Sequence, residues 1–171
     1  MTVDRITLVR IPSGSEGTKE TLRIMGDLVR RGKFNPAVFM KARELIAHLP
    51  PKDWVGQVNA CYEFVRDDIR YCHDAFGAEG LQTPEVTLSL RAGDCDDKVI
   101  LLCALLSSIG HPCRMCAVKL DDETEFSHVF AQTWIGNSWV TMETTEGPLP
   151  LGDGGPNFAR IRQPMMCFTV R

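Results

Sequence analysis

The sequence has no segment long enough to cross a membrane and no recognisable export signal. A bilayer-spanning helix needs about 20 consecutive apolar residues, whereas the longest apolar run extends only from Val99 to Leu106. Met1 is soon followed by Asp4 and Arg5 instead of the apolar core of a signal peptide. We therefore expect a cytoplasmic protein without a membrane partner.

Charge of one sign is not concentrated anywhere along the chain. Its 19 basic and 22 acidic residues leave a formal net charge of −3, and no block of Lys and Arg offsets that balance. A nucleic-acid-binding surface needs such a basic cluster, so we expect no nucleic-acid partner. The apolar share of 44% and the charged share of 24% are those of a globular protein. The length, without an internal repeat, fits a single domain over residues 1–171.

The seven cysteines do not form the pattern of a small disulfide-rich protein, because their number is odd and their spacing irregular. In a reducing compartment most of them should be buried thiols. A metal site at 111–116 is an alternative, since Cys113 and Cys116 have a zinc-like spacing. No second pair lies at a matching distance, and on a strand these two side chains point to opposite faces. We expect no metal and no cofactor.

Apolar residues recur at helical spacing in the first part of the chain and alternate in the last part. A weakly alternating segment, 2–11, is a possible edge strand, and a flexible joint is expected at 13–17. Asn35 followed by Pro36 is typical of a helix start. The expected helices cover 22–32, 36–49 and 54–69, a loop-rich stretch covers 72–84, a fully buried helix begins at Cys95, and strands cover 113–120, 127–135, 138–143 and 165–170.

Helices that come first, strands that come later and one buried helix between them predict an α+β fold. The N-terminal helical layer is expected over 15–50 and the core over about 54–146. The Gly- and Pro-rich stretch 152–163 either runs over the functional site as a lid or is a plain connection.

Cys95 is a candidate nucleophile because of its place at the start of the buried helix. Asp94 is a good N-cap for that helix, so the thiol should lie against free backbone N–H groups at the positive end of the helix dipole. This position favours the thiolate, and the same N–H groups can hold an oxyanion. Asp96 and Asp97 oppose the effect by raising the thiol pKa, so a neighbouring imidazolium is needed.

His128 and Glu143 should share one face of a β-hairpin. Gly136-Asn137 predicts a tight turn that pairs Trp134 with Trp139. Because side chains alternate along a strand, Glu143 then lies one diagonal step from His128, close enough to reach its ring. A carboxylate there fixes the imidazole tautomer and leaves the second ring nitrogen for Cys95.

At these residues the sequence resembles the transglutaminase-like superfamily, in the short form common in bacteriophages and prophages. The motifs stand in the family's order and cover about 54–146, namely 64–71, 82–85, 91–98, 105–114, 127–130 and 139–145. The resemblance implies a papain-like core in which a catalytic helix packs on an antiparallel sheet. It assigns Cys95 as nucleophile and His128 as base, and it places Glu143 where the family usually has Asp. Gln82, upstream of the nucleophile, could supply a second oxyanion N–H.

Two functions remain open. The first is a cysteine-dependent acyl-transfer enzyme that acts on amide bonds of peptides or proteins, as a peptidase or amidase or, less readily, as a transglutaminase. Glu143 is one methylene longer than the family's Asp, and this departure motivates the second. That alternative is a catalytically inactive binding or assembly module of phage or prophage origin, which could be associated with the virion.

Overall fold

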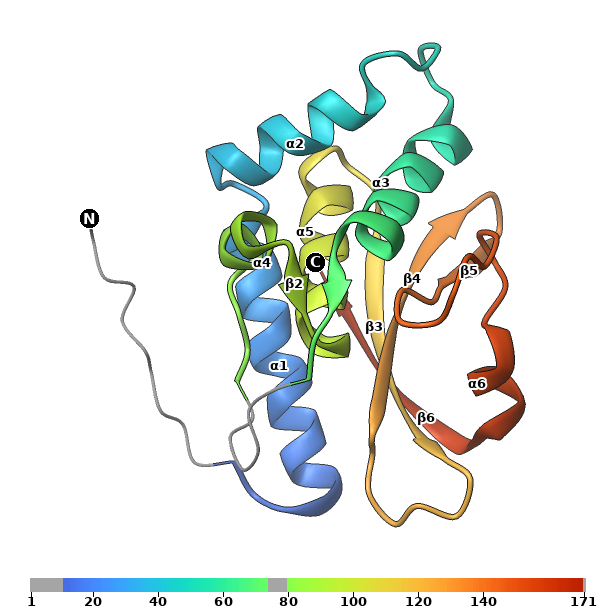
Figure 1. Cartoon of the computed structure of the whole chain (residues 1–171). Coiled ribbons are helices and arrows are strands. Elements are labelled where there is room, and N and C mark those ends of the chain that lie inside the picture. The colour runs from blue at the N-terminus through green and yellow to red at the C-terminus, as the bar shows by residue number, and fades with distance from the viewer. Residues whose placement is uncertain (1–10, 74–79, 171) are drawn as a thin grey trace, which may run out of the picture.

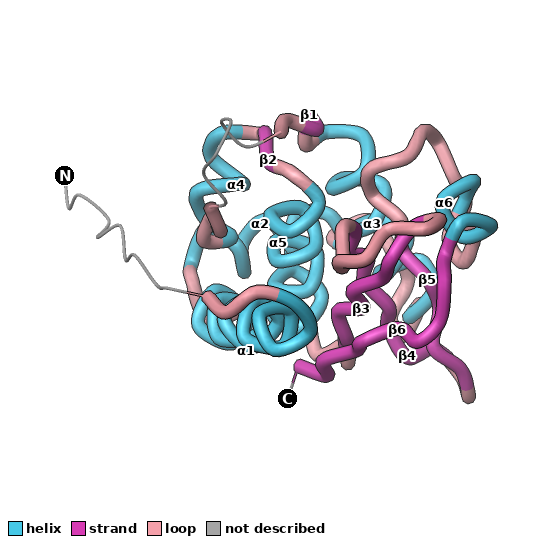
Figure 2. The backbone as a smooth tube through the Cα atoms, turned by 90° about the horizontal axis from the view of Figure 1, so that it is seen from below, coloured by secondary structure: helices cyan, strands magenta, loops and turns pink. Residues whose placement is uncertain are grey.

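The computed structural model describes residues 11–73 and 80–170 and has helices on one side and a sheet on the other (Figure 1). The buried helix α5 lies in the middle, and four other helices pack around it. Seen from below, α5 lies between α1 and α4 on one side and the sheet on the other (Figure 2). The helices are α1 (Gly14–Gly32), α2 (Pro36–Ile46), α3 (Trp54–Asp68), α4 (Pro84–Leu90), α5 (Cys95–Ser108) and α6 (Gly155–Arg160). No helix in these ranges is both long enough and apolar enough to span a membrane.

The main sheet is antiparallel and has the strand order β5-β4-β3-β6. Its strands are β3 (Cys113–Leu120), β4 (His128–Ile135), β5 (Ser138–Met142) and β6 (Ile161–Val170). Two short strands, β1 (Arg70–Tyr71) and β2 (Ala92–Gly93), pair in parallel next to the start of α5. The α+β architecture expected from the sequence is confirmed.

A capping box fixes the first residue of α5. The Asp94 carboxylate accepts a hydrogen bond from the Asp97 backbone N–H at 3.1 Å, and the Asp97 carboxylate accepts one from the Asp94 N–H at 3.4 Å. These two bonds satisfy backbone donors that a helix N-terminus otherwise leaves unpaired. Residues 97–106 are all buried, so the helix is held on every side. Cys95 is therefore the first residue of a rigid helix, as predicted.

The hairpin of β4 and β5 has the predicted register. Ile135 pairs with Ser138 and Trp134 pairs with Trp139, so the turn consists of two residues. Gly136 has a φ of +61°, a left-handed conformation that glycine adopts without steric cost. This turn sets which residues of the returning strand share a face with His128.

Several local predictions differ from the structure. The expected joint at 13–17 is the first turn of α1, where Gly17 is buried against the Pro12 carbonyl and serves close packing. The second helix ends at Ile46, before the predicted position 49. Helix α4 and the β1–β2 pair were not predicted, because each is short and carries no clear periodicity. The possible strand at 2–11 falls almost entirely outside the described residues.

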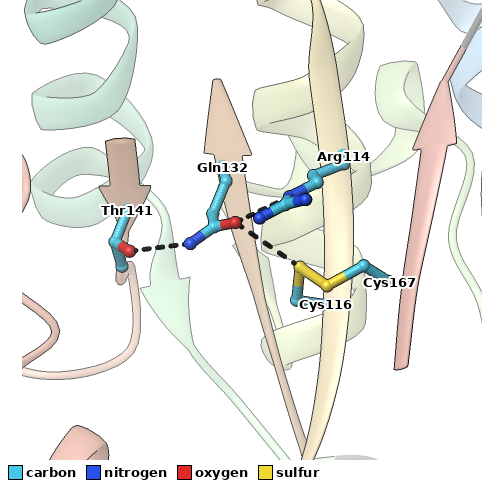
Figure 3. The surroundings of a disulfide bond; sticks show 5 residues. All are labelled: Arg114, Cys116, Gln132, Thr141 and Cys167. Atoms are coloured by element: carbon cyan, nitrogen blue, oxygen red, sulfur yellow. Dashed lines mark hydrogen bonds between the residues drawn. A yellow bond between two sulfur atoms is a disulfide. The ribbon is translucent and has the colours of Figure 1, made fainter. Parts of the chain in front are cut away.

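A disulfide bond joins the neighbouring strands β3 and β6. Cys116 and Cys167 face each other directly across the two strands, with their Cα atoms 4.1 Å apart (Figure 3). On the other side of Cys116, the Gln132 side chain accepts a hydrogen bond from Arg114 at 2.7 Å and donates one to Thr141 at 3.1 Å (Figure 3). This pair differs from the expectation of free thiols in a reducing compartment.

The remaining cysteines are free, and three of them, Cys61, Cys103 and Cys113, are the buried thiols expected from the sequence. Cys113 packs in the core under the helices, whereas Cys116 belongs to a separate apolar cluster with Val118 and Phe130. The two side chains thus point to opposite faces of β3, as predicted, and cannot bind one metal ion together.

The disulfide predicts a thiol count and a stability change. Denatured protein prepared without reductant should show five reactive thiols, and reduction should raise the number to seven. Because the bond closes a loop with a sequence separation of 51, Cys167→Ser should lower the free energy of unfolding by about 2–4 kcal/mol. Urea denaturation measures the change, and Cys72→Ser, at an exposed free cysteine, should stay within about 0.5 kcal/mol of wild type. Seven thiols before reduction would contradict the bond.

Candidate active site

Cys95, the first residue of α5, faces strand β4. Its side chain is partly buried, and its sulfur is close enough to the backbone N–H groups of Val129 and Asp96 to be stabilised by them when charged. Its Sγ lies 3.9 Å from the Asp96 carboxylate. The backbone of Val129, the residue after His128, thus lies next to the Cys95 sulfur, so the N-terminus of α5 and the start of β4 meet at Cys95.

The electrostatic surroundings of Cys95 keep its sulfur protonated in the free protein. Burial raises the thiol pKa well above its ordinary value, and the charges of Asp96 and Asp94 raise it further. The backbone N–H groups of Val129 and Asp96 lower it, but by less. Burial therefore outweighs the effect of the helix dipole that was expected to favour the thiolate. The sequence does not reveal how deeply the sulfur is buried.

His128 forms a short hydrogen bond with Glu143. Its Nε2 lies 2.6 Å from Glu143 Oε2, and the Glu143 carboxylate is completely buried. The second oxygen, Oε1, accepts hydrogen bonds from the backbone N–H and the hydroxyl of Thr145, each at 2.8 Å. The carboxylate thus folds back toward its own chain, which accommodates the extra methylene of Glu. The diagonal contact predicted from the hairpin is present.

These contacts keep Glu143 ionised despite its burial. Burial alone would raise the pKa of Glu143, but the hydrogen bonds from His128 and Thr145 outweigh it and hold the pKa below its ordinary value. The Tyr62 hydroxyl donates to the Glu143 carbonyl at 2.8 Å and so fixes the backbone of this residue. The His128 ring is thereby held on one side by a fixed, charged partner, and its Nδ1 is the ring nitrogen left to act elsewhere.

A cavity of about 980 Å³ joins Cys95 and His128. Its lining includes residues of helix α1, the loop before β4, Tyr71, His73 and the start of α5. Among the described residues, none from 152–162 lines this cavity. That segment instead carries α6, whose Phe158 packs on Phe130 at 4.8 Å between ring centres. The described part of this segment packs on the sheet at Phe130 and does not line the cavity, so the lid alternative finds no support.

Gln82 lies beside the start of α5 but is held by other contacts. Its backbone N–H donates to the Asp97 carboxylate at 2.8 Å, and its side-chain carbonyl accepts from Thr87 at 3.2 Å. Among the described residues, Leu81 lines the cavity whereas Gln82 does not. The role of Gln82 as an oxyanion donor stays a prediction.

Lys98 is a structural residue that the sequence reasoning missed. It is almost completely buried, and its ammonium group donates to the carbonyls of Ile69 at 2.8 Å and Arg66 at 3.3 Å, at the end of α3. A cation there interacts favourably with the helix C-terminus. Burial lowers the Lys98 pKa to about 8, against the opposing charges of Glu143 and Asp67. The only signal in the sequence was a charged residue at the start of an apolar run. The hydrogen bonds of Lys98 hold the chain in place just before β1.

Comparison with known proteins identifies the family of this arrangement. The model of the transglutaminase-like superfamily matches residues 41–144, and the chain belongs to this superfamily. No curated protein sequence matches the chain.

Two solved structures share the fold. One is of a candidate protease from Parabacteroides distasonis ATCC 8503, with a TM-score of 0.57, 13% identity, and coverage of 73% of this chain and 26% of the other. The second is of a candidate cysteine protease from Cytophaga hutchinsonii, with a TM-score of 0.52, 16% identity, and coverage of 79% and 51%. The chain therefore matches only about a quarter to a half of the length of these proteins.

The lowered pKa of Glu143 predicts a pH-dependent stability difference. The ionised carboxylate stabilises the fold fully above the ordinary Glu pKa of about 4.3, and this contribution is lost as the pH falls through the lower pKa in the folded protein. Glu143→Gln should therefore lower the free energy of unfolding by about 1–3 kcal/mol near neutral pH. The difference from wild type should shrink below about pH 4.

Urea denaturation over a series of pH values measures this difference. Glu63→Gln, on the exposed face of α3, is the matched control and should remain within about 0.5 kcal/mol of wild type. A difference for Glu143→Gln that grows on acidification would contradict the assignment.

Proposed function

We propose that this protein is a cysteine-dependent acyl-transfer enzyme that hydrolyses amide bonds, with Cys95 as nucleophile, His128 as general base and acid, and Glu143 as the residue that orients His128. The observation that carries the proposal is the 2.6 Å hydrogen bond between His128 and Glu143 at a cavity that also holds Cys95. A thiol at a helix N-terminus, an imidazole and a fixed carboxylate are the groups that thiol-dependent acyl transfer requires.

The first half of the reaction forms a thioester. His128 Nδ1 takes the proton of the Cys95 thiol while a sulfur electron pair forms a bond to the substrate carbonyl carbon. The C=O π electrons move to the oxygen, and the Cys95 backbone N–H donates a hydrogen bond to this oxyanion. As the intermediate collapses, the C–N bond breaks and the leaving amine takes the proton from His128.

The second half releases the acyl group. His128 takes a proton from a water molecule, whose oxygen attacks the thioester carbon. The carbon–sulfur bond then breaks, and the departing sulfur takes the proton back from His128, which gives a carboxylic acid and the free thiol. An amine in place of water would give a new amide, the outcome of a transglutaminase. We favour water because no described feature of the cavity distinguishes an amine channel.

The raised pKa of Cys95 decides how the nucleophile is activated. A stable thiolate–imidazolium pair is disfavoured in the free enzyme by burial and by the charges of Asp96 and Asp94. Proton transfer to His128 therefore accompanies the attack on the substrate instead of preceding it. The buried Glu143 charge stabilises the imidazolium that forms in this step.

A peptide or protein amide is the proposed substrate. The two solved structures that share the fold are both of candidate proteases, which supports this class. The cavity is large enough for several residues of an extended peptide, since ligand pockets commonly measure about 300–1,000 Å³.

A second function is a binding or assembly module of phage or prophage origin that keeps the fold without catalysis. The observation that favours it is the strongly raised pKa of Cys95, beside the acidic residues Asp94 and Asp96. Such a module would bind a peptide in the same cavity and release it unchanged. The two functions differ in whether new termini form.

Replacement of the nucleophile tests the proposal directly. Wild-type protein, incubated with a peptide library in H₂¹⁸O, should produce new carboxyl termini that carry ¹⁸O, whereas Cys95→Ala should lower the rate by about 10³-fold or more. Mass spectrometry detects the label, and methylamine in a parallel reaction reveals amine transfer as an added mass. Cys72→Ala, at an exposed cysteine, is the matched control. Equal cleavage by wild type and Cys95→Ala would overturn Cys95 as the nucleophile, whereas cleavage by neither would favour the binding module.

Loss of the orienting charge should slow catalysis more than binding. Glu143→Gln keeps the side-chain size but removes the charge that stabilises imidazolium, so kcat should fall by about 10²–10⁴-fold with little change in KM. Steady-state kinetics on a cleaved library peptide measures both constants, and Glu63→Gln is again the control. A change confined to KM would assign Glu143 to substrate binding instead.

A further inference from the structure

The cavity that contains Cys95 and His128 is lined by negative charge. Among the described residues of its lining, Asp94, Asp96 and Glu125 carry carboxylates, whereas none is Lys or Arg. Lys and Arg make up 19 of the 171 residues, so the composition of the chain does not explain this one-sided charge. A cleft lined by one sign of charge raises the local concentration of ligands with the opposite charge. The cavity therefore favours cationic ligands.

Asp96 lies beside the proposed nucleophile. Its Oδ1 is 3.9 Å from Cys95 Sγ, and its partly buried side chain lines the cavity. The capping box at the start of α5 uses the carboxylates of Asp94 and Asp97. A neutral side chain at position 96 would leave both of those hydrogen bonds in place. The start of the helix therefore does not account for the charge of Asp96.

In the free protein the charge of Asp96 works against the proposed reaction. Burial raises the pKa of Cys95 most, and the charges of Asp96 and Asp94 raise it further. A cationic group next to these carboxylates would offset their charge at the sulfur and so favour loss of the thiol proton. The charge that slows the reaction of a neutral substrate therefore promotes the reaction of a cationic one.

Glu125 contributes a further carboxylate from the loop between β3 and β4. Its side chain is exposed, and its Oε2 lies 4.0 Å from the position that a Cβ atom would take at Gly14, the first residue of α1. Lys119 on β3 contacts the same loop, because its ammonium lies 5.2 Å from the centre of the Phe126 ring and donates to the Thr124 carbonyl. Lys119 does not belong to the described lining of the cavity, so Glu125 adds to its negative charge.

A cationic side chain close to the reacting bond is within reach of Asp96. In the proposed reaction the substrate carbonyl carbon bonds to Cys95 Sγ, which lies 3.9 Å from the Asp96 carboxylate. The residues on either side of the scissile amide are thereby held next to Asp96, and the flexible stems of Lys and Arg can span the remaining distance. The cavity, of about 980 Å³, has room for such a side chain beside the substrate backbone.

We propose that this cavity selects peptides and proteins that carry Lys or Arg next to the scissile amide, with Asp96 as the specificity-determining residue and Glu125 as a second contact. This inference rests on the proposed function and names its substrate class. The substrate's ammonium or guanidinium group binds the Asp96 carboxylate through a charge-assisted hydrogen bond. It stays unchanged in the reaction, as neither the acyl donor nor the acceptor.

Two thiol reagents of opposite charge test the cavity without a substrate. Trimethylammonioethyl methanethiosulfonate is cationic and sulfonatoethyl methanethiosulfonate is anionic, and both form a mixed disulfide with a thiol. The ratio of the cationic to the anionic rate at Cys95, divided by the same ratio for β-mercaptoethanol, should be about 10 or more. Asp96→Asn should lower this ratio by about 5–20-fold. Mass spectrometry of the Cys95 peptide measures both rates, in a Cys72→Ser background that removes the exposed cysteine.

Peptide cleavage tests the same preference on substrates. In a library cleaved in H₂¹⁸O, the residues on one side of the labelled termini should be enriched in Lys and Arg. A peptide with Lys at that position should have a kcat/KM about 10–100-fold above that of its norleucine counterpart. Asp96→Asn should slow the Lys peptide selectively and bring the two values within about threefold of each other. Asp122→Asn, at an exposed residue outside the cavity lining, is the matched control.

The outcomes separate this inference from the proposed function. If wild type cleaves no peptide, or Cys95→Ala cleaves as fast as wild type, the proposed function is overturned, and the reagent ratio alone decides whether the cavity favours cations. If Cys95-dependent cleavage occurs with equal rates for Lys and norleucine peptides, only the inference fails. A Lys preference that persists in Asp96→Asn would overturn the role of Asp96. An equal loss on both peptides would show that Asp96 acts on the structure, and it would overturn that role as well.

Discussion

The reciprocal hydrogen bonds between Asp94 and Asp97 are the constraint on which the rest of the site depends. They fix where α5 begins and therefore where the Cys95 sulfur lies. The same Asp97 carboxylate accepts the Gln82 N–H, so one buried side chain holds both the helix start and the loop before α4. Because α5 is buried on all sides, a shift of its first turn would move Cys95, the proposed nucleophile, relative to the sheet. A capping motif of four consecutive residues thus fixes the position of Cys95 in a site whose other residues lie far away in the sequence.

The contact between His128 and Glu143 likewise depends on a few local interactions. A two-residue turn determines the register of the hairpin, the register brings Glu143 to His128, and Thr145 and Tyr62 hold the carboxylate and its backbone. The carboxylate of Glu143 is one methylene farther from its backbone than that of Asp, and its bonds to Thr145 absorb the difference. The substitution therefore preserves a charged partner for the imidazole at the place where the family usually has Asp.

The predictable features of this molecule are those governed by short-range rules. Capping residues and apolar periodicity predicted α5, and turn chemistry with strand alternation predicted the His128–Glu143 contact. The protonated state of Cys95 could not be predicted, because it depends on burial by segments distant in sequence. The position of Tyr71 follows from a strand pair too short to leave a periodic signal. The Cys116–Cys167 bond depends on a strand pairing that a bulge shifts, and no turn next to β3 and β6 specifies it.

The low acidity of Cys95 has a consequence for the survival of the protein. The deprotonated form of a cysteine is the form that attacks peroxides and disulfides, so a thiol with a raised pKa is oxidised slowly. The chain can therefore keep one pair of cysteines oxidised within its sheet and another cysteine reduced beside an open cavity. In the proposed mechanism Cys95 gives its proton to His128 only as it attacks a bound substrate, so the sulfur reacts slowly in the free protein.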